Sequence, residues 1–314
     1  MYVGRLAPSP TGLLHLGHAR TFLVAWWRAR SLGGRLLMRL EDLDGPRAKP
    51  EMSEAALRDL AWLGLDWDGP DYLQSTGLAE ISTAAADLEQ RGLGYACVCS
   101  RGDVRSAQSA PQLGDSEPRY PGTCRGKFPS LVAALAETGK DAGLRLWVPE
   151  GNVVVKDELL GERSFDVQAE VGDFLIAKRD HAPAYQLSVV VDDARQGVTE
   201  VVRGEDLFAS AARQRLLQQA LGLPAVRYVH VPLVLDESGR RLAKREDDLS
   251  LQELREGGTD PRAIVAWAAK SCGIVTGERI TARVGLINFA LSKVPREPLI
   301  LDAATIAGLR EASV

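Results

Sequence analysis

Two histidines near the N-terminus have the type and spacing to act on a developing negative charge. His15 and His18 follow the turn at residues 8–12, where a strand is expected to give way to a helix, and residues three apart share one helical face. A helix N-terminus favours phosphate, and two imidazoles add hydrogen-bond donors. Gly17, between them, leaves room for a flat base beside the backbone. Two purely structural histidines remain the alternative, because so short a pattern often arises by chance.

A basic segment later in the chain could meet the same phosphates. Residues 241–245 read Arg-Leu-Ala-Lys-Arg and follow an apolar stretch at 226–235 and a turn at 236–239. A lysine on a loop after a core strand, here Lys244, suits a mobile clamp on a polyphosphate. By itself such a pentapeptide is more often a solvated surface. Neither a GxGxxG nor a GxxxxGK[ST] motif is present, so any nucleotide must be bound by other means.

Three of the four cysteines form a cluster that suggests a metal site. In a cytosolic chain, Cys97, Cys99 and Cys124 favour metal binding over a disulfide framework. Zinc prefers four ligands, and no histidine lies between residues 97 and 124, so the fourth must be phenolate, carboxylate or water. Three unliganded thiols are the alternative. Cys272 belongs to an apolar helical segment and is expected in the core.

Strand-like stretches alternate with segments of helical period, which predicts an α/β fold with a parallel sheet. We expect strands at 2–6, 35–40, 185–191, 198–203 and 226–235, and helices at 16–32, 51–63, 76–93 and 207–221. Cysteine, proline and glycine punctuate residues 96–184, which we interpret as an inserted domain with a mobile loop at 107–120. From residue 236 the chain is predicted to be mostly helical, with Asp260 and Pro261 starting one helix.

The composition is that of an ordinary globular protein. Of 314 residues, 45% are hydrophobic and 25% charged, and no apolar run approaches the roughly 20 residues of a membrane helix. The N-terminus does not have the form of a signal peptide, so we expect a cytoplasmic protein without a membrane partner. With a net charge of −4 there is no global basic field, and RNA would have to bind a local basic face.

Taken together, the motifs resemble class I aminoacyl-tRNA synthetases, more narrowly their glutamyl and glutaminyl branch. The match covers roughly residues 2–250, with the motifs in the family's order, at residues 5–12, 15–18, 39–44, 189–206 and 241–245. This resemblance implies a Rossmann-type catalytic domain formed by residues 1–95 and 185–235. It also implies a zinc-bearing, acceptor-binding-like insert at 96–184, and a lysine-motif loop with a helical stem-contact domain at 236–314.

The resemblance implies activation of L-glutamate by ATP and Mg²⁺. His15, His18 and Lys244 would be catalytic, and the same three residues with Gly17 would bind ATP. The residues implied for glutamate binding are Arg5, Leu6, Ala7, Pro8, Ser9, Glu41, Tyr185 and Arg203. Among these, the two arginines would pair with a substrate carboxylate, because guanidinium forms bidentate bonds to it, and the glutamate side chain would receive the ammonium. A single arginine is more often part of a surface ion pair.

Three positions depart from the family's pattern. Val189 stands where tRNA-charging members normally have asparagine, which removes a polar contact from the expected amino-acid pocket. Arg241 replaces the usual lysine and Ala243 the usual serine of the lysine motif. The retained Lys244 should preserve the main phosphate contact, whereas the lost hydroxyl affects fine positioning.

Other features resemble the glutamyl-queuosine tRNA(Asp) synthetases. The chain ends soon after the lysine motif, where complete glutamyl-tRNA synthetases continue into an anticodon-binding region. In this family one structural Zn²⁺ would be held by Cys97, Cys99, Tyr120 and Cys124. Glutamate would be attached, by a monomer, to queuosine in the anticodon of tRNA(Asp). The alternatives are a shortened synthetase charging tRNA(Glu), a silent relative that binds glutamate, AMP or RNA, and a nucleotidyltransferase acting on a small molecule.

Overall fold

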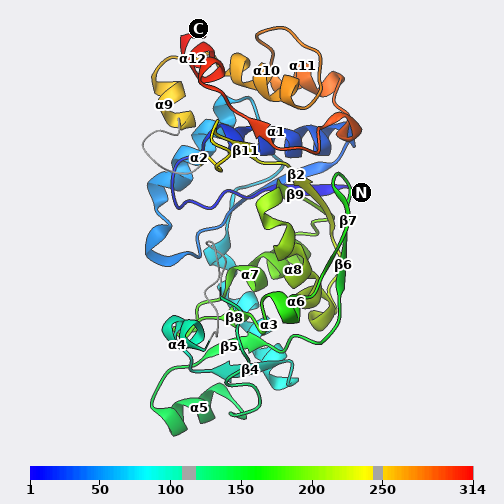
Figure 1. Ribbon diagram of the computed structural model, residues 1–314. Helices are drawn as coiled ribbons and strands as arrows, with labels where there is room; N and C mark the ends of the chain where they lie inside the picture. Colours follow the sequence, from blue (N-terminus) through cyan, green and yellow to red (C-terminus); the bar gives the residue numbers. More distant parts are fainter. Residues whose placement is uncertain (108–117, 243–249, 314) are drawn as a thin grey trace.

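The computed structural model describes residues 1–107, 118–242 and 250–313. Figure 1 shows an elongated molecule with three tiers: C-terminal helices at one end, a central sheet region, and a smaller sheet with short helices at the other end. The expected α/β class with parallel strands is confirmed. Lys244 and most of the predicted loop at 107–120 lie outside the described residues.

The first half of the central sheet has the parallel strand order β1-β2-β3. Its strands are β1 (Val3–Leu6), β2 (Arg35–Leu40) and β3 (Tyr72–Leu73). The helices α1 (Leu16–Ser31) and α2 (Pro50–Trp62) form the crossovers, and η1 (Gly45–Arg47), η2 (Gln74–Gly77) and α3 (Leu78–Gln90) complete this half. Because parallel strands place their carboxyl ends at one edge, the turns after β1 and β2 come together.

The second half contributes the parallel pair β9 (Glu200–Gly204) and β10 (Arg227–Val231). Helices α7 (Tyr185–Arg195) and α8 (Phe208–Leu221), with η3 (Glu205–Leu207), accompany these strands. Hydrogen bonds join the halves at the amino ends of β1 and β9: the Thr199 amide donates to the Val3 carbonyl at 2.8 Å, and the Val3 amide donates to Thr199 Oγ1 at 3.0 Å. Arg5 Nη1 also donates to the Val202 carbonyl at 3.2 Å, so the two strands are held side by side.

The prediction of a strand at 185–191 is wrong, because these residues form the first part of helix α7. Residues 186–193 are all buried, the polar Gln186, Ser188, Asp192 and Asp193 among them, so this part of the helix is covered by neighbours on every side. A short, continuously apolar run that is rich in valine has no helical period and is typical of a buried strand. Tertiary packing decides the outcome here, not local propensity.

The expected insert forms its own antiparallel sheet of order β4-β5-β8. Its elements are β4 (Gly94–Cys97), α4 (Arg101–Ser106), α5 (Leu131–Thr138), β5 (Gly143–Leu146), α6 (Val167–Glu170) and β8 (Leu175–Ala177). The hairpin of β6 (Val153–Asp157) and β7 (Gly161–Phe165) is not part of this sheet. Its strand β6 pairs in parallel with β10, so a hairpin from within the insert extends the central sheet, which the sequence did not predict.

The C-terminal part is mostly helical, as predicted. It contains α9 (Leu251–Glu256), α10 (Pro261–Ser271), α11 (Ala282–Ile287), η4 (Leu291–Lys293) and α12 (Ala303–Glu311), with β11 (Val234–Leu235) paired to β12 (Leu299–Ile300). Asp260 caps α10 by accepting from the Arg262 amide, and Pro261 occupies the first turn, which confirms the predicted helix start.

Helix α1 is packed against these C-terminal helices. The fully buried Trp27 donates through Nε1 to the Ala282 carbonyl at 2.9 Å. Arg20, also fully buried, donates to the Pro232 carbonyl at 2.7 Å and to Ser271 Oγ at 2.9 Å. Cys272 is buried in the same core, as expected. One hydrophobic cluster therefore supports both the N-terminal helix and the C-terminal helices.

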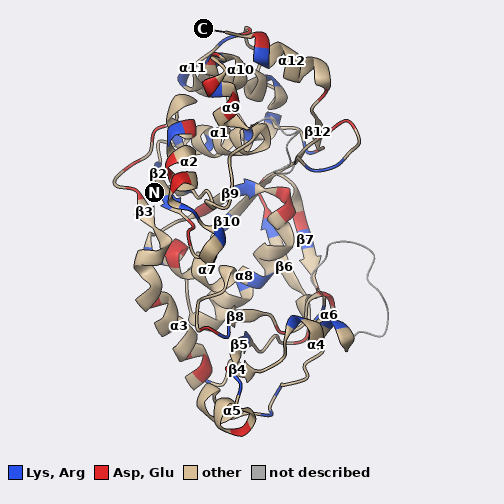
Figure 2. Ribbon diagram, turned by 90° about the vertical axis from the view of Figure 1, so that its left-hand side faces the viewer, with Lys and Arg blue, Asp and Glu red and all other residues tan. Residues whose placement is uncertain are grey.

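Acidic and basic positions are interspersed along the whole molecule, from the insert to the C-terminal helices (Figure 2). This distribution agrees with a net charge close to zero for a chain of this length. Among the described residues, no helix combines the length and the apolar character needed to cross a membrane.

Candidate active site and metal site

A cleft of about 650 Å³ opens at the carboxyl ends of β1 and β9, beside the start of α1. Ten of the twelve residues predicted to bind ATP or glutamate line it: Arg5, Ala7, Pro8, Ser9, His15, Gly17, His18, Glu41, Tyr185 and Arg203. Of the other two, Leu6 points its side chain into the core, as strand alternation requires, and Lys244 lies outside the described residues. The cleft thus unites motifs that are up to about 240 residues apart in the chain.

The two histidines form the N-terminus of helix α1. His15 is the N-cap residue, and its Nδ1 accepts from the Gly17 amide at 3.1 Å. His18 Nδ1 accepts from the His15 amide at 3.2 Å, and the two ring centroids are 3.8 Å apart. A neutral imidazole that accepts at Nδ1 carries its proton on Nε2, so each ring is a donor through Nε2. The cap therefore fixes the orientation of two donors at the positive end of a helix.

The backbone of Gly17 lies so close to the His15 ring that there is little room for a side chain, which the sequence did not predict. An added Cβ would lie 3.0 Å from Cε1 and 3.1 Å from Nδ1 of His15, closer than side chains normally approach. Any larger residue would displace the His15 ring from its capping position. The glycine therefore protects the geometry of the histidine pair.

A cluster of buried charges includes two residues of the cleft lining, Arg5 and Glu41. Arg39 is completely buried and contacts Asp193 at 2.7 Å and Glu41 at 3.4 Å. Arg5 lies 3.5 Å from the same Asp193 oxygen, and Ser9 Oγ donates to Glu41 at 3.5 Å. The roles of Arg39 and Asp193 were not predicted, although strand alternation places residues 39 and 41 on the same side of β2. The positive charges of two arginines are thus balanced by the negative charges of two carboxylates in a buried, low-dielectric environment.

Arg203 is held differently, by neutral groups. Its Nε donates to His230 Nε2 at 3.1 Å, one Nη donates to Gln214 Oε1 at 2.8 Å, and the other to the Leu207 carbonyl at 3.1 Å. Neither His230 nor Gln214 was predicted, since no motif includes them. Their contacts leave the positive charge of Arg203 without a carboxylate at hydrogen-bonding distance among the described residues.

Val189 does not form part of the cleft wall. It is buried on α7, one turn beyond Tyr185, which begins the helix and lines the cleft. The position at which an asparagine was expected to contact the substrate is therefore a buried, apolar one behind the cleft lining.

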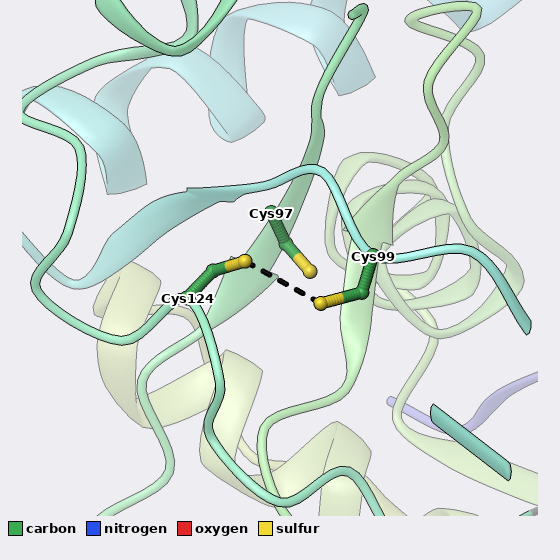
Figure 3. Close-up of side chains that lie close together, drawn as sticks. All are labelled: Cys97, Cys99 and Cys124. Atoms are coloured by element: carbon green, nitrogen blue, oxygen red, sulfur yellow. Dashed lines mark hydrogen bonds between the residues drawn. The ribbon is translucent and has the colours of Figure 1, made fainter. Parts of the chain in front are cut away.

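The predicted metal ligands converge in the insert (Figure 3). The sulfur atoms of Cys97, Cys99 and Cys124 all lie within 4.8 Å of one another. Tyr120 Oη is 3.3 Å from Cys97 Sγ and 3.9 Å from Cys99 Sγ, and it accepts from the Cys124 amide at 2.8 Å. Burial raises the pKa of the Cys99 thiol to about 12 and also raises the pKa of Tyr120. These are the donor types and the spacing that a zinc ion requires.

Arg145 adds a positive charge beside this cluster. Its Nε donates to Cys97 Sγ at 3.2 Å, and its guanidinium lies 3.7 Å from the centre of the Tyr120 ring. Three thiolates around a divalent cation leave a net negative charge, which a buried guanidinium compensates. Arg145 lies on β5, in no recognisable motif, and was not predicted. The four candidate ligands and this cation together fit a closed metal site.

Comparison with known proteins agrees with the geometry. The family model for the catalytic domain of class I tRNA synthetases (E and Q) matches residues 2–300. The chain belongs to this family. The predicted resemblance is confirmed.

Full-length relatives narrow the assignment within the class I synthetases. The Glutamyl-Q tRNA(Asp) synthetase of Symbiobacterium thermophilum is 44% identical over 98% of both chains. The protein of the same name from Nitratidesulfovibrio vulgaris is 40% identical over 99% of both. The Glutamate–tRNA ligase 2 of Acidithiobacillus ferrooxidans is 39% identical, but the match covers only 64% of that protein. The chain therefore belongs with the Glutamyl-Q tRNA(Asp) synthetases.

Solved structures confirm the fold. The glutamate–tRNA synthetase of Elizabethkingia anophelis superposes with a TM-score of 0.82 at 24% sequence identity. The match covers 98% of this chain and 69% of that one. The tertiary arrangement of a glutamate-specific synthetase core is thus preserved at low sequence identity.

Proposed function

We propose that the protein activates L-glutamate with ATP and transfers the glutamyl group to queuosine in the anticodon of tRNA(Asp). The observation that carries this proposal is the match to Glutamyl-Q tRNA(Asp) synthetases over nearly the full length of both chains. The cleft supplies the chemistry, because its lining includes both phosphate-directed donors, His15 and His18, and carboxylate-directed arginines, Arg5 and Arg203.

In the activation step, one glutamate carboxylate attacks the α-phosphorus of ATP and pyrophosphate leaves. His15 and His18 donate to the phosphate oxygens through Nε2, and Lys244 is proposed to add a positive charge. Arg5 and Arg203 hold the other carboxylate, while Glu41 pairs with the ammonium. Mg²⁺ accompanies ATP as part of the substrate. Catalysis is then mainly positioning and charge stabilisation.

Glutamate binding is expected to weaken on acidification. Burial raises the pKa of Glu41 above its ordinary value, against the opposing effects of Arg39 and Arg5, with Asp193 adding to the rise. A protonated Glu41 cannot form an ion pair with the substrate ammonium, so the KM for glutamate should rise on acidification. Because the pKa of Glu41 is raised, this rise should begin at a higher pH than it would for an ordinary carboxyl group. ATP–pyrophosphate exchange between pH 5 and pH 8, roughly the range above ordinary carboxyl titration, measures this effect.

The matched control is Glu41→Gln, which removes the titrating group and preserves the shape. This variant should have a KM for glutamate that is high and nearly independent of pH. An equally steep pH dependence in the variant would assign the effect to another group.

We further propose that one zinc ion is bound in the insert by Cys97, Cys99, Tyr120 and Cys124. Four protein ligands leave no open position for water, which is the arrangement of a structural site. Arg145 compensates the charge of the bound thiolates. The metal thus stabilises the insert and takes no part in glutamate activation.

The acceptor specificity gives the decisive test of the proposed function. Labelled glutamate should enter tRNA(Asp) that carries queuosine, and should not enter tRNA(Asp) without queuosine or tRNA(Glu). Trimming the 3′-terminal adenosine should leave labelling unchanged, because a hydroxyl of the queuosine ring attacks the activated carbonyl. Periodate cleaves vicinal diols, including that of queuosine, and should abolish labelling.

Two other results would identify the competing functions. Label on the 3′ end of tRNA(Glu), lost on trimming, would make the protein a shortened tRNA(Glu)-charging synthetase. Absence of glutamate-dependent exchange with ATP would make it a binding relative without catalysis. Nuclease mapping of the labelled fragment separates the anticodon from the acceptor end.

The RNA must approach the cleft as a single-stranded loop with an extruded base. Arg240 is exposed beside the cleft, and Arg241 lines it and contacts Asp206. These arginines are candidates for phosphate contacts, which make binding weaker as the salt concentration rises. The C-terminal helices α9–α12 are the proposed stem-contact region.

A further inference from the structure

The immediate support of Arg203 is a hydrogen-bonded chain of three buried side chains from three adjacent strands. Arg203 on β9 faces His230 on β10, and β10 pairs with β6 beside Asp157. Arg203 Nε donates to His230 Nε2 at 3.1 Å, and His230 Nδ1 lies 2.7 Å from Asp157 Oδ2. His230 is fully buried, and its ring stacks on Phe208 with a centroid separation of 4.4 Å.

The donor pattern fixes the protonation of His230. A guanidinium Nε can only donate, so His230 Nε2 must accept and the ring proton resides on Nδ1, where Asp157 receives it. Asp157 is itself oriented by the backbone, since it accepts from the amides of Leu159, Leu160 and His230. Burial and the charge of Arg203 lower the pKa of His230 to about 4, against the opposing effects of Asp157 and Asp206. The imidazole is therefore neutral at neutral pH.

We propose that His230 and Asp157 are positioning residues for glutamate, and that they orient Arg203 without neutralising it. A carboxylate in direct contact with Arg203 would neutralise its charge, as Asp193 does for the buried Arg39, and would compete with the substrate carboxylate. A neutral imidazole aligns the guanidinium and leaves its charge to the substrate. This inference rests on the proposed role of Arg203 in glutamate binding. It also gives the β6–β7 hairpin, which carries Asp157, a role in specificity.

Two amide substitutions at His230 separate positioning from packing. Glutamine places its amide near the position of Nε2 and can still accept from Arg203, whereas asparagine reaches only the position of Nδ1. We therefore expect His230→Asn to raise the KM for glutamate about tenfold or more, the range for losing a hydrogen bond to a charged group. His230→Gln should retain most of the affinity. The KM for ATP should change little in either variant.

Equal increases in the KM for glutamate in both variants, or equal effects on the KM values of glutamate and ATP, would overturn the positioning role. The control is His181→Asn, which changes an exposed histidine outside the cleft and should leave both KM values unchanged. Melting temperatures of the two His230 variants show whether folding is comparable. If the unchanged protein shows no glutamate-dependent ATP–pyrophosphate exchange, the proposed function itself is wrong, whatever the results with the variants.

A second measurement needs no variant and does not depend on folding of a mutant. The chain has four histidines, so ¹⁵N-histidine labelling gives few signals in a nuclear magnetic resonance spectrum. At neutral pH, His230 should show a neutral ring with the proton on Nδ1. A proton on Nε2, or a charged imidazolium, would contradict the proposed chain of hydrogen bonds.

Discussion

Replacing His18 with alanine is expected to lower the rate of glutamate-dependent ATP–pyrophosphate exchange about 10²- to 10³-fold, the range for losing one transition-state donor. The structure places His18 at the first turn of α1, with Nδ1 occupied by the His15 amide and Nε2 as the donor. The α-phosphate of ATP is already anionic, and further negative charge builds up on its oxygens as the carboxylate attacks. The loss should therefore appear in kcat, with little change in the KM for glutamate.

Two conservative variants test whether the Nε2 donor carries this effect. His18→Asn keeps an acceptor near Nδ1 for the His15 amide, so the helix cap survives, but it lacks the Nε2 donor. His18→Gln places an amide near Nε2. We expect the asparagine variant to be nearly as slow as alanine and the glutamine variant to recover part of the rate. Similar rates for alanine and the unchanged protein would show that His18 serves only the helix cap.

Replacing Cys124 with alanine is expected to reduce bound zinc from one equivalent per chain to none and to destabilise the insert strongly. Structural zinc sites contribute on the order of 10 kcal/mol of apparent binding free energy, which is coupled to folding. The three sulfurs and Tyr120 form the centre of a small buried cluster, so loss of the ion leaves several polar groups in an apolar environment. Metal analysis and thermal unfolding of gently purified protein measure both effects.

Cys272→Ala is the matched control, because this cysteine is equally buried but belongs to the core of the C-terminal helices. It should lower stability modestly through lost packing and leave the zinc content unchanged. Tyr120→Phe should weaken zinc binding without abolishing it. Unchanged zinc affinity in that variant would assign the fourth position to another ligand, whereas zinc-free native protein would remove the metal site altogether.

The sequence predicted the parts of the site that lie in contiguous motifs. The histidine pair, Glu41 and the cysteine cluster are found where spacing and resemblance indicated. The supports of these residues were not predictable, because His230 and Arg145 act through contacts between strands that are distant in the chain. Strand pairing, which determines these contacts, leaves no local pattern in the residues.

The same reason explains the two differences in the fold. Residues 185–191 belong to a helix whose residues 186–193 are all buried, and this environment is created by neighbours and not by the segment itself. The hairpin β6–β7 leaves the insert because β6 finds a parallel partner in β10, more than 70 residues away in the chain. In both cases a long-range contact outweighs the local pattern.

The packing of α1 on the C-terminal helices has a consequence for fragments of this protein. Trp27 and Arg20 place an indole and a guanidinium from the histidine-bearing helix into a core that residues beyond the lysine motif complete. A minimal catalytic fragment that stopped near residue 242 would expose this indole and leave the guanidinium without Ser271. Such a fragment should aggregate when expressed, even though it contains every described residue of the cleft. The smallest autonomous unit for this chemistry therefore extends through α11, well past its last catalytic motif.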